Sequence, residues 1–250
     1  MPTLMKLIPV FLLALILATE TGVFAASFVV SPIRVFFDKK LSKDKITIVN
    51  NGLEDVSLQI SVREWDQNEL AVDRYVVTKD IIFFPKLFVL KKGEQRVVRL
   101  GYRGKGDPTQ EITFRLFVDE IRNKKKVAKD EKLNLLLSIG VPIFVTPNIV
   151  KKNLEIGDPL IDQNAVKVAI RNQGNVYELV KTVSIRGLDG TDILFEREKR
   201  GWYILDGKRA NFSIDIKQGE CKRIKKIAIT VKTENDTLER EVEVEPHQCG

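Results

Sequence analysis

Short apolar runs separated by polar turns follow one another along most of the chain. Residues 56–65 place Val56, Leu58, Ile60 and Val62 at every second position, the pattern of a strand with one buried face. Helical periodicity is scarce, and turn signals recur about every 8–15 residues. The pattern predicts an all-β chain of short strands, as in a β-sandwich.

The predicted strands fall into two groups on either side of Thr146-Pro147-Asn148. The first group of seven is enough for one immunoglobulin-like (Ig-like) sandwich, and prolines interrupt two of its members. Its strands are expected at residues 27–37, 45–49, 56–65, 81–90, 95–102, 112–121 and 133–145. Those of the second group are expected at 165–171, 179–187, 193–197, 202–205 and 210–216, followed by a terminal hairpin. We therefore expect two Ig-like domains, residues 26–147 and 148–250.

The N-terminal 25 residues have the pattern of a secretory signal peptide. Lys6 precedes an apolar run over residues 7–18, which is too short to span a bilayer comfortably, and small residues surround Ala25. We expect cleavage after Ala25 and export of the mature chain. The alternative is an uncleaved N-terminal anchor or a buried helix.

Export makes the two cysteines, Cys221 and Cys249, candidates for a disulfide. Asn235-Asp236 is turn chemistry between two alternating runs. In a hairpin centred on Asn235, Cys221 and Cys249 would face each other across the open end. A disulfide closing such a loop contributes about 3 kcal/mol in the chain-entropy model. Two unpaired thiols are the alternative.

Composition and charge argue against most enzyme classes. The net charge is +7, but both signs are spread along the chain, so no nucleic-acid partner is required. A single histidine, His247, and two cysteines leave little material for a zinc site or a Ser/His/Asp triad. No Gly-rich loop opens a helix. We expect no catalysis, no metal or other cofactor, and no small-molecule substrate.

The predicted strand over residues 133–145 is the most informative element. Leu133, Leu135, Leu137, Ile139 and Val141 share one face, and the intervening residues are mostly small or polar. Two interpretations stay open. The run is either an ordinary interior strand or an edge strand that presents an apolar row to a guest chain by strand addition.

Several segments, taken in order, resemble the periplasmic pilus chaperones of the chaperone–usher pathway, the PapD-like family. The similar segments are residues 33–37 (IRVFF), 50–52 (NNG), 63–65 (REW), 84–100, 114–121 (FRLFVDEI) and 144–147 (FVTP). The ending VPIFVTP is similar to the non-classical branches of this family. The resemblance implies two Ig-like sandwiches set at an angle around Thr146-Pro147.

The resemblance also implies a site and partners. Leu133, Leu135, Leu137, Ile139 and Val141 would complete an incomplete Ig-like pilus subunit. Arg34 would bind the C-terminal carboxylate of that subunit, because a guanidinium binds carboxylates in a bidentate way. For Arg34, a solvated strand residue or an inter-domain ion pair is the alternative. An outer-membrane usher is the second implied partner, the periplasm is the implied location, and the exposed edge would also permit self-association.

Two positions depart from the family pattern. Pro142 stands where the family has a second cationic residue, a lysine, and candidates for a substitute are Arg99, Lys132, Lys151 and Lys152. Thr146 stands where the family has an arginine that pairs with the position of Glu120, so another contact must link the domains. If the chain is instead an exported structural or adhesive protein, residues 133–141 are core, and charged substitutions there unfold the domain.

Overall fold

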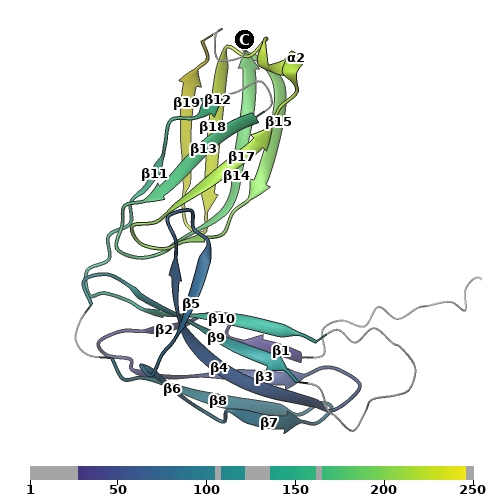
Figure 1. Cartoon of the computed structure of the whole chain (residues 1–250), viewed down its shortest axis with the longest axis vertical. Coiled ribbons are helices and arrows are strands. Elements are labelled where there is room, and N and C mark those ends of the chain that lie inside the picture. The colour runs from purple at the N-terminus through teal and green to yellow at the C-terminus, as the bar shows by residue number, and fades with distance from the viewer. Residues whose placement is uncertain (1–27, 105–107, 122–135, 162–164, 246–250) are drawn as a thin grey trace, which may run out of the picture.

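A computed structural model of the chain describes residues 28–104, 108–121, 136–161 and 165–245. Figure 1 shows two β-sandwiches whose strands run in different directions, so that the domains meet at an angle. Strands β1 to β10 (purple to teal) build the first, and β11 to β19 (teal to yellow) build the second. The fold class is as predicted. The signal peptide predicted for residues 1–25 lies outside the described residues.

Two sheets enclose the core of the first domain. One has the order β1-β3-β8-β6, formed by Phe28–Ser31, Lys43–Asn50, Gln95–Tyr102 and Ile81–Phe84. The other has the order β2-β10-β9-β4-β5, formed by Val35–Phe37, Ser138–Val145, Ile112–Glu120, Val56–Gln67 and Asp73–Val77. Strand β7 (Leu87–Leu90) also pairs with β4. Sequence analysis missed β5, which Figure 1 shows projecting toward the second domain.

Two predicted strands each divide between the two sheets at a proline. The run over residues 27–37 becomes β1, paired with β3, and β2, paired with β10. The run over 81–90 becomes β6, paired with β8, and β7, paired with β4. Pro32 and Pro85 lie between the halves, and a proline cannot donate to a strand ladder. Consequently, the first strand contributes only three residues beside β10.

The alternation in β4 explains how the first core forms. Val56, Leu58, Ile60 and Val62 are all buried in that core, as predicted. Farther along the same strand, Trp65 and Gln67 are also buried, although they belong to the opposite face of the alternation. That outer face is therefore covered as well, and the cover is the second domain.

The second domain repeats the two-sheet arrangement. In one sheet, β13 (Ala165–Asn172) pairs with β11 (Leu154–Ile156), β12 (Leu160–Ile161) and β17 (Arg209–Asp215). The other has the order β15-β14-β18-β19, formed by Asp192–Arg200, Glu178–Asp189, Lys226–Thr233 and Thr237–Glu243, and β16 (Tyr203–Ile204) also pairs with β14. Sequence analysis missed β11, β12 and the short helix α2 (Gln218–Cys221). No helix in the described ranges has the length and apolar character needed to cross a membrane.

The turn of the terminal hairpin is centred between residues 234 and 235, whereas the prediction centred it on Asn235. Lys232 pairs with Thr237, so the two-residue loop is Glu234-Asn235 rather than a loop centred on Asn235. Thr233 explains the difference, because its main-chain N–H donates to the Asp236 carbonyl at 2.8 Å and its hydroxyl accepts from the Asp236 N–H at 2.9 Å. The register argument for the disulfide is therefore wrong.

The predicted disulfide itself does not depend on that register. Cys221 ends helix α2 rather than lying on a strand, and it is buried and disulfide-bonded. Cys249, the other cysteine of the chain, lies outside the described residues. The pairing of Cys221 with Cys249 stays a prediction.

Each domain contains the same buried Asn-X-Gly device. The Asn50 amide donates to the Leu90 carbonyl at 2.9 Å, and its Oδ1 accepts from the Gly52 N–H at 2.9 Å. Asn172 repeats this arrangement, with Gly174 as the donor to its Oδ1. Both asparagines are fully buried. Each side chain thus satisfies main-chain groups that would otherwise be unpaired beneath a turn.

We expect Asn50→Ala to lower the free energy of unfolding by about 2–4 kcal/mol, because it leaves buried main-chain groups without partners. Chemical denaturation followed by circular dichroism measures the effect. Asn51→Ala is the matched control, since Asn51 is the exposed neighbour in the same turn and its loss changes stability by less than about 0.5 kcal/mol. Equal effects of the two substitutions would contradict this role of Asn50.

Candidate functional site: an open strand edge at the domain junction

Strand β10 is paired along its whole length on one side but only at its end on the other. Strand β9 pairs with all of Ser138–Val145. On the opposite side, the parallel strand β2 pairs only with residues 143–145. Among the described residues, no strand pairs with positions 138–142 on this second side. The predicted edge therefore exists in this part of the strand.

The backbone groups of the even-numbered residues point to the open side. The Leu137 carbonyl accepts from the Glu120 N–H at 2.9 Å, so odd-numbered positions bond to β9. On the other side, the Thr146 N–H donates to the Phe37 carbonyl at 2.8 Å, which continues the β2 ladder at even positions. It follows that Ser138, Gly140 and Pro142 direct their main-chain groups outward. Pro142 is tolerated here because no strand in the part of the chain that the structure describes needs its missing N–H.

The predicted apolar row occupies the inner face of β10. Leu137 and Ile139 are partly buried at the rim of the first core, whereas Val141 is 1% exposed and belongs to the core itself. The side chain of Val141 is therefore unavailable to a guest chain, contrary to its inclusion in the predicted site. Leu133 and Leu135 lie outside the described residues.

Arg34 lies directly before β2, next to the point where the open edge ends. Because Val35 pairs with Ile143, Arg34 is in register with Pro142. Its guanidinium forms a bidentate ion pair with Glu234 of the second domain, with bonds of 2.5 and 2.6 Å, and donates to the Tyr177 hydroxyl at 3.2 Å. The hydrogen bond to Glu234 raises the pKa of Arg34. In this state of the molecule, Arg34 is an inter-domain ion pair, which was the alternative interpretation.

The candidate substitutes for the missing cation occupy different places. Arg99 is exposed on β8, in the other sheet. Lys151 is exposed beyond the last strand of the first domain, and Lys132 lies outside the described residues. Lys152 is 3.5 Å from the Glu178 carboxylate and is one of the charges that lower the pKa of Glu234. Lys152 is therefore the candidate that shares its surroundings with Arg34.

A sequence model of one protein family matches residues 27–151, half of the chain, and is described as "Pili and flagellar-assembly chaperone, PapD N-terminal domain". The chain belongs to this family. None of the curated proteins compared with it is similar.

Solved structures agree with this chaperone in fold. A chaperone–tip adhesion subunit pre-assembly complex, CsuC–CsuE from archaic Csu pili of Acinetobacter baumannii, contains a chain 20% identical, with a TM-score of 0.59, covering 86% of this chaperone and 98% of that chain. A chain of the SafA pilin–SafB chaperone complex of Salmonella enterica is 15% identical with a TM-score of 0.55, and the match covers 88% of this chaperone and 98% of that chain. The Escherichia coli chaperone DraB is 18% identical with a TM-score of 0.54, and the match covers 88% of this chaperone and 98% of DraB.

The two domains of the chaperone meet through a cluster of aromatic side chains. Phe144 projects from the outer face of β10 and stacks on Tyr177 with ring centroids 4.0 Å apart. Trp65 meets Tyr203 edge to face at 5.4 Å. Trp65, Phe144 and Tyr203 are buried together with Leu205. The cluster therefore covers the outer face of the sheet beside the end of the open edge.

Gln67 joins the domains through main-chain groups. Its side-chain amide donates to the Tyr203 carbonyl at 2.9 Å, and its Oε1 accepts from the Leu205 N–H at 3.0 Å. The same amide donates to Asp73 at 3.0 Å. Sequence analysis missed Gln67, although a glutamine two positions after Trp65 on the non-core face was an available signal.

Arg115 fills the contact between β9, β5 and the second domain. Its guanidinium lies 3.9 Å from the Trp65 ring centroid and donates to Asp73 at 3.0 Å and to the Tyr75 hydroxyl at 2.6 Å. Trp202 of the second domain donates to the same Asp73 carboxylate at 3.3 Å. These contacts link the domains without an arginine at position 146.

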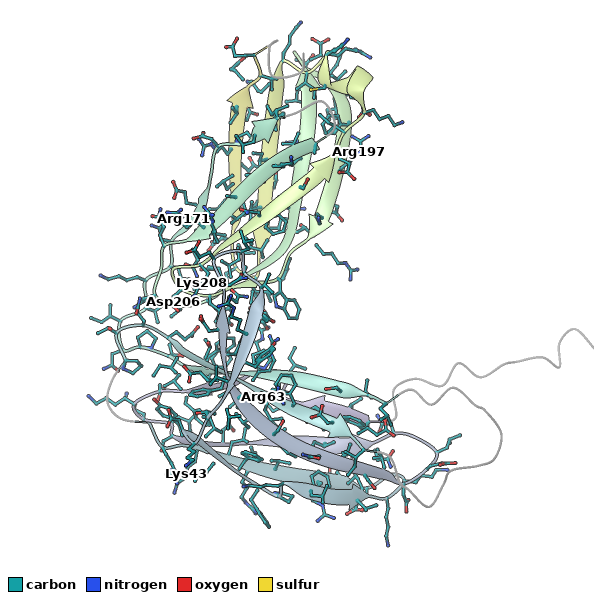
Figure 2. The ribbon with its side chains drawn as sticks, in the orientation of Figure 1. Lys43, Arg63, Arg171, Arg197, Asp206 and Lys208 are labelled. Atoms are coloured by element: carbon teal, nitrogen blue, oxygen red, sulfur yellow. The ribbon has the colours of Figure 1, made fainter. Side chains whose placement is uncertain are left out.

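A cavity of about 610 Å³ between the domains has an acidic lining. Glu64, Asp66, Glu111 and Asp206 contribute carboxylates, and Lys208 forms an ion pair with Asp66 at 2.9 Å. Figure 2 shows Asp206 and Lys208 on the side of the second domain that faces the first. This lining repels a carboxylate ligand, so the cavity is no substitute for Arg34 as the carboxylate site.

Glu111 is the buried carboxyl of this lining. Its side chain accepts from the Tyr177 N–H at 2.9 Å, and its own N–H donates to the Asn175 carbonyl at 2.9 Å, so both contacts cross between domains. Glu111 is only 8% exposed, and burial raises the pKa of its carboxyl to about 8. The neutral form is therefore the one that suits the folded junction.

We expect the free energy of unfolding to contain a component that falls as pH rises because of Glu111. Its unfolded pKa is about 4.3 and its folded pKa is about 8, so between these values the folded state binds more protons. This stabilising component is fully present below the unfolded pKa and is lost as the pH rises through the folded pKa. At about 1.4 kcal/mol per pKa unit, it amounts to a few kcal/mol.

Chemical denaturation at several pH values from about 5 to about 8 measures this component. Glu111→Gln retains an acceptor for Tyr177 but does not titrate, so the component disappears in this variant. Glu64→Gln, at an exposed position of the same cavity, leaves it in place. A Glu111→Gln protein with the unchanged pH profile would contradict the assignment.

Proposed function

We propose that the chain is a periplasmic chaperone that binds incomplete Ig-like pilus subunits by strand addition to β10 and delivers them to an outer-membrane usher. The observation that carries the proposal is the open edge of β10, which ends in register with Arg34. This role requires binding and release but no chemical turnover.

The direction of β2 supports a specific orientation of the guest strand. Strand β2 runs parallel to β10 and occupies its edge from Val35 onward. A guest strand that continues the line of β2 backward along the open edge, and runs parallel to β10, has its C-terminal end beside Arg34. A guanidinium at that point suits a terminal carboxylate, because it offers a bidentate, charge-assisted contact. The backbone ladder and the terminal charge would then fix the register together.

The side chains along the edge support an apolar guest. Leu137 and Ile139 are only partly buried by their own domain, so a neighbouring strand adds cover to both. Pairing of main-chain groups supplies affinity in such complexes, and alternate side chains supply selectivity. Leu133 and Leu135 extend the same alternation and belong to the proposed binding row.

The similar solved structures support the class of partner. One contains a chaperone with a tip adhesion subunit, and another contains a chaperone with a pilin. Pilus subunits are the corresponding partners proposed here. Family membership supports the periplasmic location, and the usher contact is proposed by analogy with the family.

We expect Leu137→Asp to reduce subunit binding at least about 10-fold, equivalent to about 1.4 kcal/mol, because a charge replaces an apolar contact at the edge. Co-purification from the periplasm, followed by mass spectrometry of the bound chain, measures the loss, and circular dichroism checks the fold. Leu136→Asp is the matched control, since Leu136 is 48% exposed and neighbours Leu137 in the sequence. Val141→Asp instead unfolds the domain by burying a charge.

A Leu137→Asp protein that folds normally and still co-purifies with an undiminished amount of subunit would contradict the assignment of the edge. If Leu137→Asp unfolds the domain as Val141→Asp does, residue 137 acts as core, and the edge assignment is likewise wrong.

A further inference from the structure

Arg34 already holds a carboxylate that belongs to the chain itself. The two Glu234 oxygens lie 2.5 and 2.6 Å from the two terminal guanidinium nitrogens of Arg34. This paired geometry is the one that an arginine uses for any carboxylate, including a chain terminus. A ligand carboxylate and Glu234 therefore compete for the same guanidinium nitrogens.

The hairpin that carries Glu234 is positioned to deliver this carboxylate. Glu234 is the first loop residue between β18 and β19, and Thr233 closes the loop through Asp236. The Glu234 N–H also donates to the Leu179 carbonyl at 3.1 Å, which fastens the loop to β14. The backbone is thus held within the second domain, and only the side chain reaches across to the first.

Glu234 has cationic neighbours besides Arg34. Besides Arg34, which is the main cause of the lowered pKa of Glu234, Lys181 and Lys152 act on this carboxylate. Glu178, 3.5 Å from Lys152, and Asp236 are further carboxylates of the same cluster. Glu234 therefore keeps two neighbouring cations, Lys152 and Lys181, when Arg34 is not its partner. Lys181 was not among the cations considered from the sequence.

The exposure of the pair permits exchange. The Arg34 side chain is 18% exposed and that of Glu234 is 32% exposed. Solvent therefore reaches both partners, and Glu234 turns toward water as a ligand carboxylate takes its place at Arg34, so that neither charge is left buried and unpaired. An unpaired Arg34, in contrast, would be a largely desolvated cation in the empty protein.

We propose that Glu234 is a placeholder carboxylate, which neutralises Arg34 in the empty chaperone and is displaced by the C-terminal carboxylate of a captured polypeptide. Lys152 and Lys181 then keep Glu234 favourably placed after its release. This inference rests on the proposed function. Its consequence is that the placeholder lowers the apparent affinity for carboxylate ligands, because only the fraction of molecules with a free Arg34 binds them. Capture also breaks an ion pair between the domains.

The test compares two fluorescently labelled peptides of alternating valine and serine, one with a free C-terminal carboxylate and one with a C-terminal amide. Fluorescence anisotropy gives the dissociation constants for the unchanged chaperone and for Glu234→Gln. We expect Glu234→Gln to bind the carboxylate peptide about 10-fold more tightly and the amide peptide with unchanged affinity. We expect Arg34→Gln to bind the two peptides equally.

Asp66→Asn is the matched control, because it removes another inter-domain ion pair, with Lys208, at a place lined by acidic residues. It changes neither dissociation constant if the effect of Glu234 is competition. If Glu234→Gln leaves the preference for the carboxylate peptide unchanged, or if Asp66→Asn alters it equally, the placeholder is wrong, although strand capture stands. If neither peptide binds any variant, strand addition itself is contradicted, and the proposed function with it.

Discussion

The division of the first strand at Pro32 is the constraint on which the rest of the structure depends. Because β1 pairs with β3 and only β2 remains beside β10, no strand of the described segments pairs with this edge over residues 138–142. A first strand that ran uninterrupted along β10 would close this edge. The same division puts Arg34 at the junction between the open and closed parts. The unpaired main-chain groups of β10 and the position of Arg34 at their end therefore both result from the division of the first strand at Pro32.

The second domain covers what the first leaves exposed on its outer face. Trp65, Gln67 and Phe144 project away from the first core and are buried where side chains of the second domain lie against them, namely those of Tyr177, Tyr203 and Leu205. Burial of these large side chains supplies the apolar part of the inter-domain contact, and the Gln67 bonds supply its direction. The position of Glu234 opposite Arg34 depends on this contact. The angle between the sandwiches is thus part of the site.

The local pattern of apolar and polar residues predicted the positions of strands better than it predicted which strands and side chains contact one another. The alternation of Val56, Leu58, Ile60 and Val62 specified a buried face, and it did so without long-range information. In contrast, strand β5 (Asp73–Val77) contains charged residues and is largely exposed, so no apolar pattern distinguishes it from a loop. The hairpin loop was misplaced because the bonding of Thr233 decides between adjacent turn geometries. Arg34 was found, but Glu234, 200 positions away, has no sequence signal that links it to Arg34.

If the edge binds a guest strand as proposed, Pro142 restricts the kind of polypeptide that fits there. A guest residue opposite Pro142 would find no N–H donor for its carbonyl oxygen. Directly beyond Pro142, β2 already pairs with the edge of β10. The interior of a longer chain would lose a hydrogen bond there and then collide with β2. A chain that stops at this point would avoid both costs and would present two carboxylate oxygens beside the Arg34 guanidinium, in competition with Glu234. In the proposed function, the fold would thus discriminate between the end of a polypeptide and its middle by geometry.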